Sequence, residues 1–352
     1  LLLAAGLAGW LVLMYRALRP AIRDPKRSEL ASLFLYAAAA IPLFYLPALF
    51  FGPRTNFAVI DNWRFWIIHL WVEGFFELFA TVLVAVMFLV LGLVTPRTAT
   101  RVVYLDAILY LAGGIVGTGH HWYFTGQGTL NMGLAACFSA LEVVPLTLLT
   151  LDAWDFVKLR QRRCDDCHAA FADRHRWTVY FLMAVGFWNF VGAGVFGFLI
   201  NLPVVSYFEV GTSLTSNHGH AAMFGVFGML ALAVLVFTLR SLARDEVWAR
   251  AERFVRVGFW GLNAGLAAMM AIDLFPAGVL QLQDVLQNGY WHARRLTYLM
   301  EGTFHTLEWA RAAADGLFLV AGVVPLVAAV AVLLLGSRRG HAAPARPHGG
   351  TI

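Results

Sequence analysis

Apolar segments of membrane-spanning character recur along almost the whole 352-residue chain. A transmembrane helix needs about 20 predominantly apolar residues. Segments of this kind lie at roughly 1–15, 31–51, 63–94, 102–124, 130–157, 177–201, 217–239, 255–278 and 306–336. Only 13% of the residues are charged, which is about half the share found in soluble domains. We therefore expect an all-α fold, a polytopic membrane bundle of about nine spans, and exclude a water-soluble enzyme.

The basic residues indicate how such a bundle would be oriented. If the spans alternate in direction, 21 of the 26 Lys and Arg residues fall in connections on one side: 16–30, 95–101, 158–176, 240–256 and the tail from Gly336. The other connections, 52–64, 125–129, 202–216 and 279–311, hold only five. Because cytoplasmic loops carry the excess of Lys and Arg, we expect the first set to be cytoplasmic. The bundle is then expected over 1–336, with a disordered cytoplasmic tail over 337–352. The net charge of +5 thus reports orientation, and no nucleic-acid partner is expected.

Five histidines lie at a similar depth in three expected spans, near the side opposite the basic loops. They are His69, His120, His121, His218 and His220. Ionisable groups inside a bilayer are costly and usually functional. A single histidine would more often be hydrogen-bonded between helices, but five at one level favour a metal site, since imidazole binds iron, copper and zinc.

The spacing of the histidines adds chemical detail. His218 and His220 are two residues apart, which on a helix is a rotation of about 200°, so they face opposite ways and can ligate two different groups. Gly219 between them leaves room for large planar ligands such as haem, whose iron takes axial histidines. His120 and His121 are adjacent at an expected helix end, where both can reach one metal.

Three glutamates accompany the histidines within the spans. Glu73 and Glu77 follow His69 at intervals of four, so the three share one helix face. Glu142 lies on a later span. Hydrogen bonding between helices is the simpler explanation for each carboxylate. The alternative is a metal, a proton path, or both.

The order of these motifs resembles that of the haem–copper oxidase superfamily over about residues 30 to 335. The resemblance implies that a non-haem metal is held by His69, His120 and His121, with Thr118 to Tyr123 similar to the family's metal-binding turn. It further implies that His218 binds a high-spin haem and His220 a low-spin haem. His69 corresponds to the sixth of twelve family helices. The chain then covers helices four to twelve, and three helices and an N-terminal extension are expected upstream. These would supply the second axial histidine of the low-spin haem and part of a calcium site between the haem propionates.

One position distinguishes the branches of this superfamily. Oxygen-reducing members usually carry Tyr four residues after the first metal histidine, and here that residue is Glu73. This is similar to nitric oxide reductases, whose metal is iron with a glutamate ligand, and a carboxylate favours iron over copper. The resemblance implies reduction of two NO to N2O and water at a haem b3/non-haem iron site, with electrons from low-spin haem b. Glu77 and Glu142 would then relay protons.

The electron donor is suggested by two segments. Residues 126–131 and 152–156 are similar to the quinol-dependent form of these enzymes, in a bacterial inner membrane with the metal site near the periplasmic side. A cytochrome-c-dependent form and a terminal oxygen reductase remain alternatives. A non-catalytic haem-binding membrane protein or transporter is a third. Possible partners are NO, quinol or cytochrome c, the lipid, and a second copy in a homodimer.

Two further motifs have competing interpretations. Arg294 and Arg295 form either an ordinary surface pair or a clamp for haem propionates, since arginine pairs well with carboxylates. Cys164 and Cys167, followed by His168, match the c-type haem string. Their loop is expected on the cytoplasmic side, where that haem is not attached, so a zinc site or an inert loop is favoured.

Overall fold

The computed structural model describes residues 1–25, 28–122, 126–160 and 168–341, except for the side chains of residues 28, 73, 111–112, 156–160, 168–170 and 337–341. Within this part of the chain all regular structure is helical, with no strand. The expected all-α class is therefore confirmed.

The helices follow one another with short connections. The first half comprises α1 (Leu2–Ile22), α2 (Ser28–Tyr45), η1 (Leu46–Leu49), α3 (Phe57–Phe65), η2 (Trp66–Phe75), α4 (Phe76–Val90), α5 (Pro96–Leu109), η3 (Tyr110–Gly114), α6 (Ile115–Gly117), η4 (Thr118–His121), α7 (Thr129–Leu141) and α8 (Val144–Arg160). The second half comprises α9 (His168–Arg174), α10 (Arg176–Trp188), η6 (Asn189–Phe196), α11 (Gly197–Asn201), α12 (Pro203–Glu209), α13 (Ser213–Ala222), η7 (Met223–Gly228), α14 (Met229–Leu242), α15 (Asp245–Met269), η8 (Met270–Leu274), α16 (Phe275–Asn288), η9 (His292–Arg294), α17 (Leu296–Leu299), α18 (Gly302–Leu317), η10 (Phe318–Val323) and α19 (Val324–His341).

Eight helical stretches of the described chain are long and apolar enough to cross a membrane: Leu2–Ile22, Glu29–Leu49, Phe57–Val90, Thr129–Asp155, Arg176–Asn201, Ser213–Leu242, Asp245–Asn288 and Gly302–Gly336. Each overlaps one expected span, so the chain is a multi-pass membrane protein. The ninth expected span, 102–124, corresponds to an unbroken helical path from Pro96 to His121 that packs beside α4 and α8. This path is more polar than the rest because α5 carries Arg97, Arg101 and Asp106. At the other end, α19 continues to His341, past the expected bundle boundary at 336.

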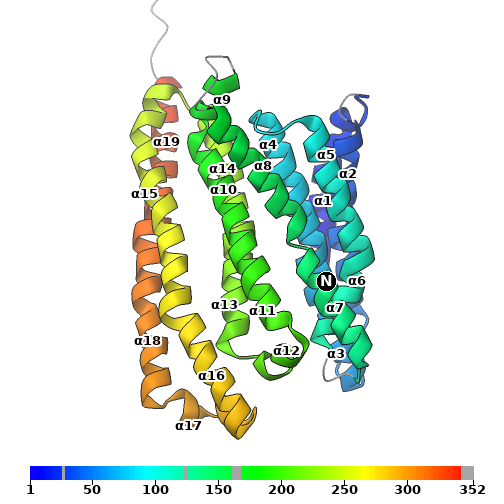
Figure 1. The fold of residues 1–352 in the computed structure, drawn as a ribbon. Coiled ribbons are helices and arrows are strands. Elements are labelled where there is room, and N and C mark those ends of the chain that lie inside the picture. The colour runs from blue at the N-terminus through cyan, green and yellow to red at the C-terminus, as the bar shows by residue number, and fades with distance from the viewer. Residues whose placement is uncertain (26–27, 123–125, 161–167, 342–352) are drawn as a thin grey trace, which may run out of the picture.

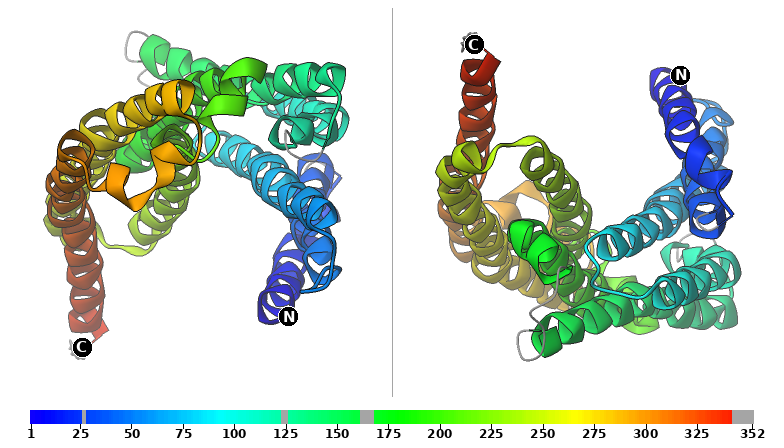
Figure 2. Two further views of the ribbon diagram at one scale, coloured as in Figure 1. Left: turned by 90° about the horizontal axis from the view of Figure 1, so that it is seen from below. Right: turned by 90° about the horizontal axis from the view of Figure 1, so that it is seen from above.

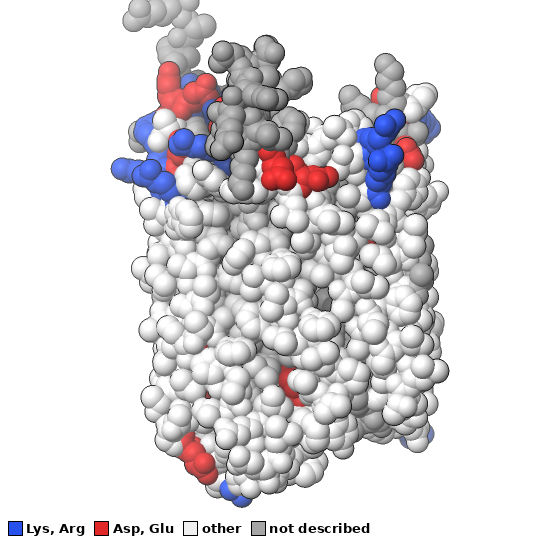
Figure 3. Space-filling model, in the orientation of Figure 1, with Lys and Arg blue, Asp and Glu red and all other residues white. Residues whose placement is uncertain are grey.

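The long helices run nearly parallel to one axis (Figure 1). Viewed along that axis, they form an arc with α1 at one end and α19 at the other (Figure 2). Lys and Arg gather at the end of the bundle that carries α9, while the belt below it on the visible face is nearly free of charge (Figure 3). This distribution is typical of a protein whose middle lies in lipid.

Wide π-helical turns interrupt several spans, among them η2, η6 and η8. Such turns change the direction of the side chains that follow and are frequent at functional sites. Small residues allow close helix approach elsewhere: a Cβ added to Gly261 would collide with the carbonyl group of Ala321. Helices α15 and η10 are thus in backbone contact, as small residues permit in membranes.

Candidate metal centre

Three of the expected metal ligands come together at the junction of η2 and η4. One nitrogen of each of His69, His120 and His121 lies within 4.8 Å of the others. The ring centroids are 4.7 Å apart for His69 and His120, and 4.0 Å apart for His120 and His121. His69 and His120 are buried and His121 is half-buried. Three converging imidazoles make a donor set that suits iron, copper or zinc.

The local fold explains why two adjacent histidines reach one point. Thr118–His121 form a 3₁₀ turn, which is tighter than an α-helix, at the end of the path that begins at Pro96. Phe65 stacks on the ring of His121 with a centroid distance of 4.9 Å and an interplanar angle of 4°, which fixes the plane of that ring. Gly119 lets α7 approach, since a Cβ there would lie 2.9 Å from Nδ2 of Asn131.

Thr118 orients His69 from the neighbouring segment. Its Oγ1 lies 3.4 Å from Nδ1 of His69 and donates to the carbonyl oxygen of Gly114 at 3.0 Å. Because the only hydroxyl hydrogen is used on Gly114, the imidazole must be the donor in the contact with Thr118. This selects the tautomer with the proton on Nδ1 and leaves Nε2 as the ligand atom, an arrangement common around metal-bound histidines.

Glu142 lies against the same cluster. A Cβ added to Gly114 or to Gly117 would be 3.4 Å from Oε1 of Glu142, and the Cβ on Gly117 would be 3.5 Å from Cε1 of His69. The two glycines therefore make room for a buried carboxyl group next to the histidines. Such a group can deliver or accept a proton at the centre.

Glu77 lies further along the line that begins at His69. Its carboxyl group is beside the hydroxyl of Tyr110, a buried residue that also interacts electrostatically with Glu142. The side chain of Glu73, between His69 and Glu77 in sequence, lies outside the described residues. Tyr110 was missed by the sequence analysis, as was buried Asp106 one helical turn before it. Their spacing of four was the available signal.

His218 and His220 point away from each other, as their spacing predicts. Nδ1 of His218 lies 2.9 Å from the carbonyl oxygen of Gly192, and Nδ1 of His220 lies 2.8 Å from that of Ser216. Both imidazoles thus donate from Nδ1 to the backbone, which leaves Nε2 to accept. This is the tautomer that an axial haem ligand requires.

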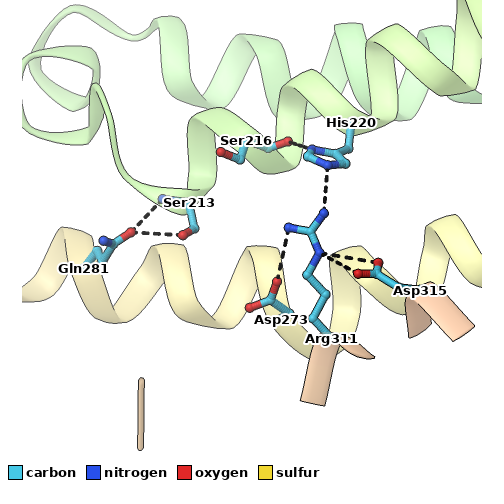
Figure 4. Close-up of polar contacts among 7 residues, drawn as sticks. All are labelled: Ser213, Ser216, His220, Asp273, Gln281, Arg311 and Asp315. Atoms are coloured by element: carbon cyan, nitrogen blue, oxygen red, sulfur yellow. Dashed lines mark hydrogen bonds and ion pairs between the residues drawn. The ribbon is translucent and has the colours of Figure 1, made fainter. Parts of the chain in front are cut away.

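The environment of His220 includes a network that sequence reasoning missed. Arg311 lies 3.0 Å from Nε2 of His220 and is paired with Asp273 at 3.8 Å and with Asp315 at 3.3 Å (Figure 4). Arg311 was expected in an outer connection, and this was wrong: it lies within α18, where fully buried Asp273 compensates its charge. The residues fit a haem at His218. At His220, the nitrogen that would bind iron accepts from Arg311 in this structure.

The two expected propionate-binding arginines have different surroundings. Arg294 donates to the carbonyl oxygens of Val210 and Tyr290 and lies over the Tyr290 ring, whereas Arg295 is exposed. Arg294 therefore fastens the loop after α12 to η9. Arg295 is the more accessible of the two to an anionic group.

Glu209 is buried close to Arg294. Burial raises the pKa of Glu209 to about 7, although a 2.5 Å hydrogen bond from Thr215 and the charge of Arg294 lower it. The carboxyl group therefore changes charge near neutral pH in the connection that leads into α13.

The cysteine motif of the basic loop lies outside the described residues. This applies to Cys164 and Cys167, and to the side chain of His168 at the start of α9.

Comparison with known proteins gives two findings. The family model described as cytochrome c and quinol oxidase polypeptide I matches residues 1–317. A nitric oxide reductase polypeptide of Stutzerimonas stutzeri is 30% identical over 262 residues, which make up 73% of this chain and 52% of that protein. The chain thus spans about half the length of the curated relative that it matches.

Proposed function

Because the chain belongs to the cytochrome c and quinol oxidase polypeptide I family, and so to the haem–copper oxidases, we propose that it forms the catalytic core of a nitric oxide reductase. The reaction is the reduction of two NO molecules, with two electrons and two protons, to N2O and water. The observation that carries this proposal is the convergence of His69, His120 and His121 within 4.8 Å beside buried Glu142.

The residues have separate tasks in this proposal. His69, His120 and His121 hold a non-haem iron, with Glu73 as a further ligand. His218 holds haem b3. The two irons, when bound, supply the redox chemistry and the binding sites for NO. A carboxylate at position 73 supports iron rather than copper, because it is a harder ligand than imidazole.

Electron entry involves the opposite face of α13. His220 holds low-spin haem b, and Arg311 leaves Nε2 of His220 when that haem is bound. The propionates of the haems extend toward Arg294 and Arg295, which lie in the same outer connection. Quinol is the donor, with cytochrome c as the alternative.

Protons are supplied by the chain's own acids. Glu142, against Gly117 and near His69, gives its proton to the reacting nitrogen oxide, and Glu77 restores it. The two glycines beside Glu142 keep the acid close without a side chain in the way. The basic end of the bundle faces the cytoplasm of a bacterial inner membrane, and the centre lies toward the other face.

The test uses the haem-loaded enzyme in detergent under anaerobic conditions. Nitrogen-15-labelled NO is added with reduced quinol or reduced cytochrome c in parallel, and labelled N2O is measured by mass spectrometry. The proposal predicts labelled N2O from the wild type with quinol and none from His120→Ala. Oxygen consumption without N2O formation would assign the chain to the oxygen reductases, and formation with cytochrome c alone would overturn the quinol assignment.

A further inference from the structure

Two lines of residues face each other between neighbouring membrane helices. Each line has a spacing of four, so its members share one helix face. They are His69, Glu73, Glu77 and Thr81 on η2 and α4, and Asp106, Tyr110, Gly114 and Thr118 on the path from α5 to η4. The helices run in opposite directions and pack together, so a step of four along one is matched by a step of four along the other.

Three pairs show that the two lines are in register. Thr118 meets His69 at the histidine cluster. One step away from the next position, Tyr110 lies beside Glu77. Furthest from the cluster, Asp106 lies beside Thr81 and within electrostatic reach of Glu77. We call this array, from Asp106 to His69, the polar seam.

The polar seam reaches well away from the metal centre. Asp106 lies ten residues into α5, which begins at the basic end of the bundle, so it is about 15 Å along the helix from that end. Asp106 and Thr81 are fully buried, and Tyr110 is 1% exposed. A carboxyl group in such a position is costly in a membrane and is usually functional.

The neighbours of Asp106 bear on its role. The described groups that interact with it are a hydroxyl and a second carboxyl group, not a cation. A structural ion pair is therefore not what places an acid here. Groups that can both accept and donate protons instead continue through Glu77 and Tyr110 toward Glu142, whose oxygen lies against Gly114 and Gly117.

We propose that Asp106 and Tyr110 are proton-relay residues that extend the path from Glu142 toward the basic end of the bundle; this rests on the proposed function. A proton that Glu142 gives to the reaction is replaced by the hydroxyl proton of Tyr110, which takes one from Glu77. Glu77 is reprotonated by Asp106, and Asp106 takes a proton from water entering from the basic end. Each group is thus returned to its starting state, and one proton has crossed the polar seam.

The alternative is that these groups only bind α4 to α5, as interhelical polar contacts do in membranes. Conservative variants of the haem-loaded enzyme separate the two roles. Asp106→Asn keeps the shape and polar contacts but cannot carry a proton, and Asp106→Glu keeps the acid. Tyr110→Phe removes one hydroxyl. Tyr104→Phe is the matched control, since Tyr104 lies on the same helix but is exposed and bonded to Glu29.

The relay predicts that Asp106→Asn and Tyr110→Phe lower NO turnover at least tenfold while haem absorption and metal content stay unchanged. Turnover in Asp106→Glu should recover, and Tyr104→Phe should match the wild type. Wild-type turnover in Asp106→Asn would overturn the proposal. If Asp106→Asn does not accumulate, wild-type turnover in Tyr110→Phe overturns it.

A second readout does not depend on NO turnover. The redox-induced infrared difference spectrum of the wild type should contain a carboxylic acid band that is absent in Asp106→Asn and retained in Tyr104→Phe. Identical spectra would overturn the role of Asp106. Failure of the wild type to reduce NO would instead contradict the proposed function, while this band would still report proton exchange at Asp106.

Discussion

Nδ1 of His69 lies 3.4 Å from the hydroxyl oxygen of Thr118, and that hydroxyl donates to the carbonyl oxygen of Gly114. The two residues are 49 positions apart in sequence but are fixed to each other by the packing of η2 against η4. The contact sets the tautomer of an imidazole that faces two others. The orientation of the metal centre therefore depends on a residue that is not itself a ligand.

Thr118→Val should weaken metal binding without removing a ligand. Loss of a hydrogen-bonding partner of a ligating histidine costs about 10- to 100-fold in metal affinity. Competition with a chelator, followed by metal analysis, measures this. Thr118→Ser retains the hydroxyl and should bind metal as the wild type does. Equal affinity in all three proteins would show that Thr118 does not orient His69.

Gly197→Ala should impair the haem site at His218. A Cβ there would lie 3.0 Å from Cε1 and 3.3 Å from Nδ1 of an imidazole already fixed by Gly192. The ring must shift, and such overpacking costs about 1–3 kcal/mol. We expect a lower ratio of high-spin haem to protein, measured by absorption spectroscopy. Gly133→Ala on α7, where nothing lies within 4 Å, is the control; an equal loss of haem there would contradict the steric explanation.

Gly261→Ala should lower the stability of the bundle. The new Cβ would collide with the backbone of Ala321, so α15 and η10 would have to separate. The expected cost is at least about 1–3 kcal/mol. A thermal unfolding curve in detergent would show a lower midpoint. Gly316→Ala on adjoining α18 meets nothing within 4 Å and should leave the midpoint unchanged or raise it.

The stability of the connection before α13 should depend on pH through Glu209. Burial raises the pKa of this carboxyl group from 4.5 to about 7 in the folded protein. Between these two values the folded state holds a proton that the unfolded state has released. The contribution to stability is therefore complete below about pH 4.5 and is lost as the pH rises through 7, by on the order of 3 kcal/mol.

Glu209→Gln removes this dependence because its amide does not titrate. The difference between unfolding midpoints at pH 5.5 and pH 8 should be smaller in Glu209→Gln than in the wild type. Glu301→Gln, in an exposed position of the next outer connection, should retain the wild-type difference. The account of Glu209 fails if all three proteins respond to pH alike.

The course of the fold could be predicted from the sequence because the membrane imposes a length on each apolar segment. The polarity of α5 was not foreseen: Arg97, Arg101 and Asp106 lie on a helix that packs among others. The π-helical turns were not foreseen either. They arise where helices of fixed length must fit around one another, and apolar periodicity carries no signal for a single wide turn.

The histidine cluster could be predicted because five costly side chains lay at one depth. The polar seam could not, since Asp106, Tyr110 and Thr118 are ordinary residues one by one and only their shared spacing relates them to His69. Arg311 was misplaced for another reason. Basic residues were assigned to connections, and the buried partner that allows one inside a helix, Asp273, is 38 positions away in sequence.

The central claim is that His69, His120 and His121 hold a non-haem iron. The most direct measurement is elemental analysis of the haem-loaded enzyme together with its haem content. The wild type should contain iron in excess of its haem iron, and His120→Ala should lose that excess while retaining low-spin haem absorption. Copper in place of the excess iron, or excess iron undiminished in His120→Ala, would contradict the account.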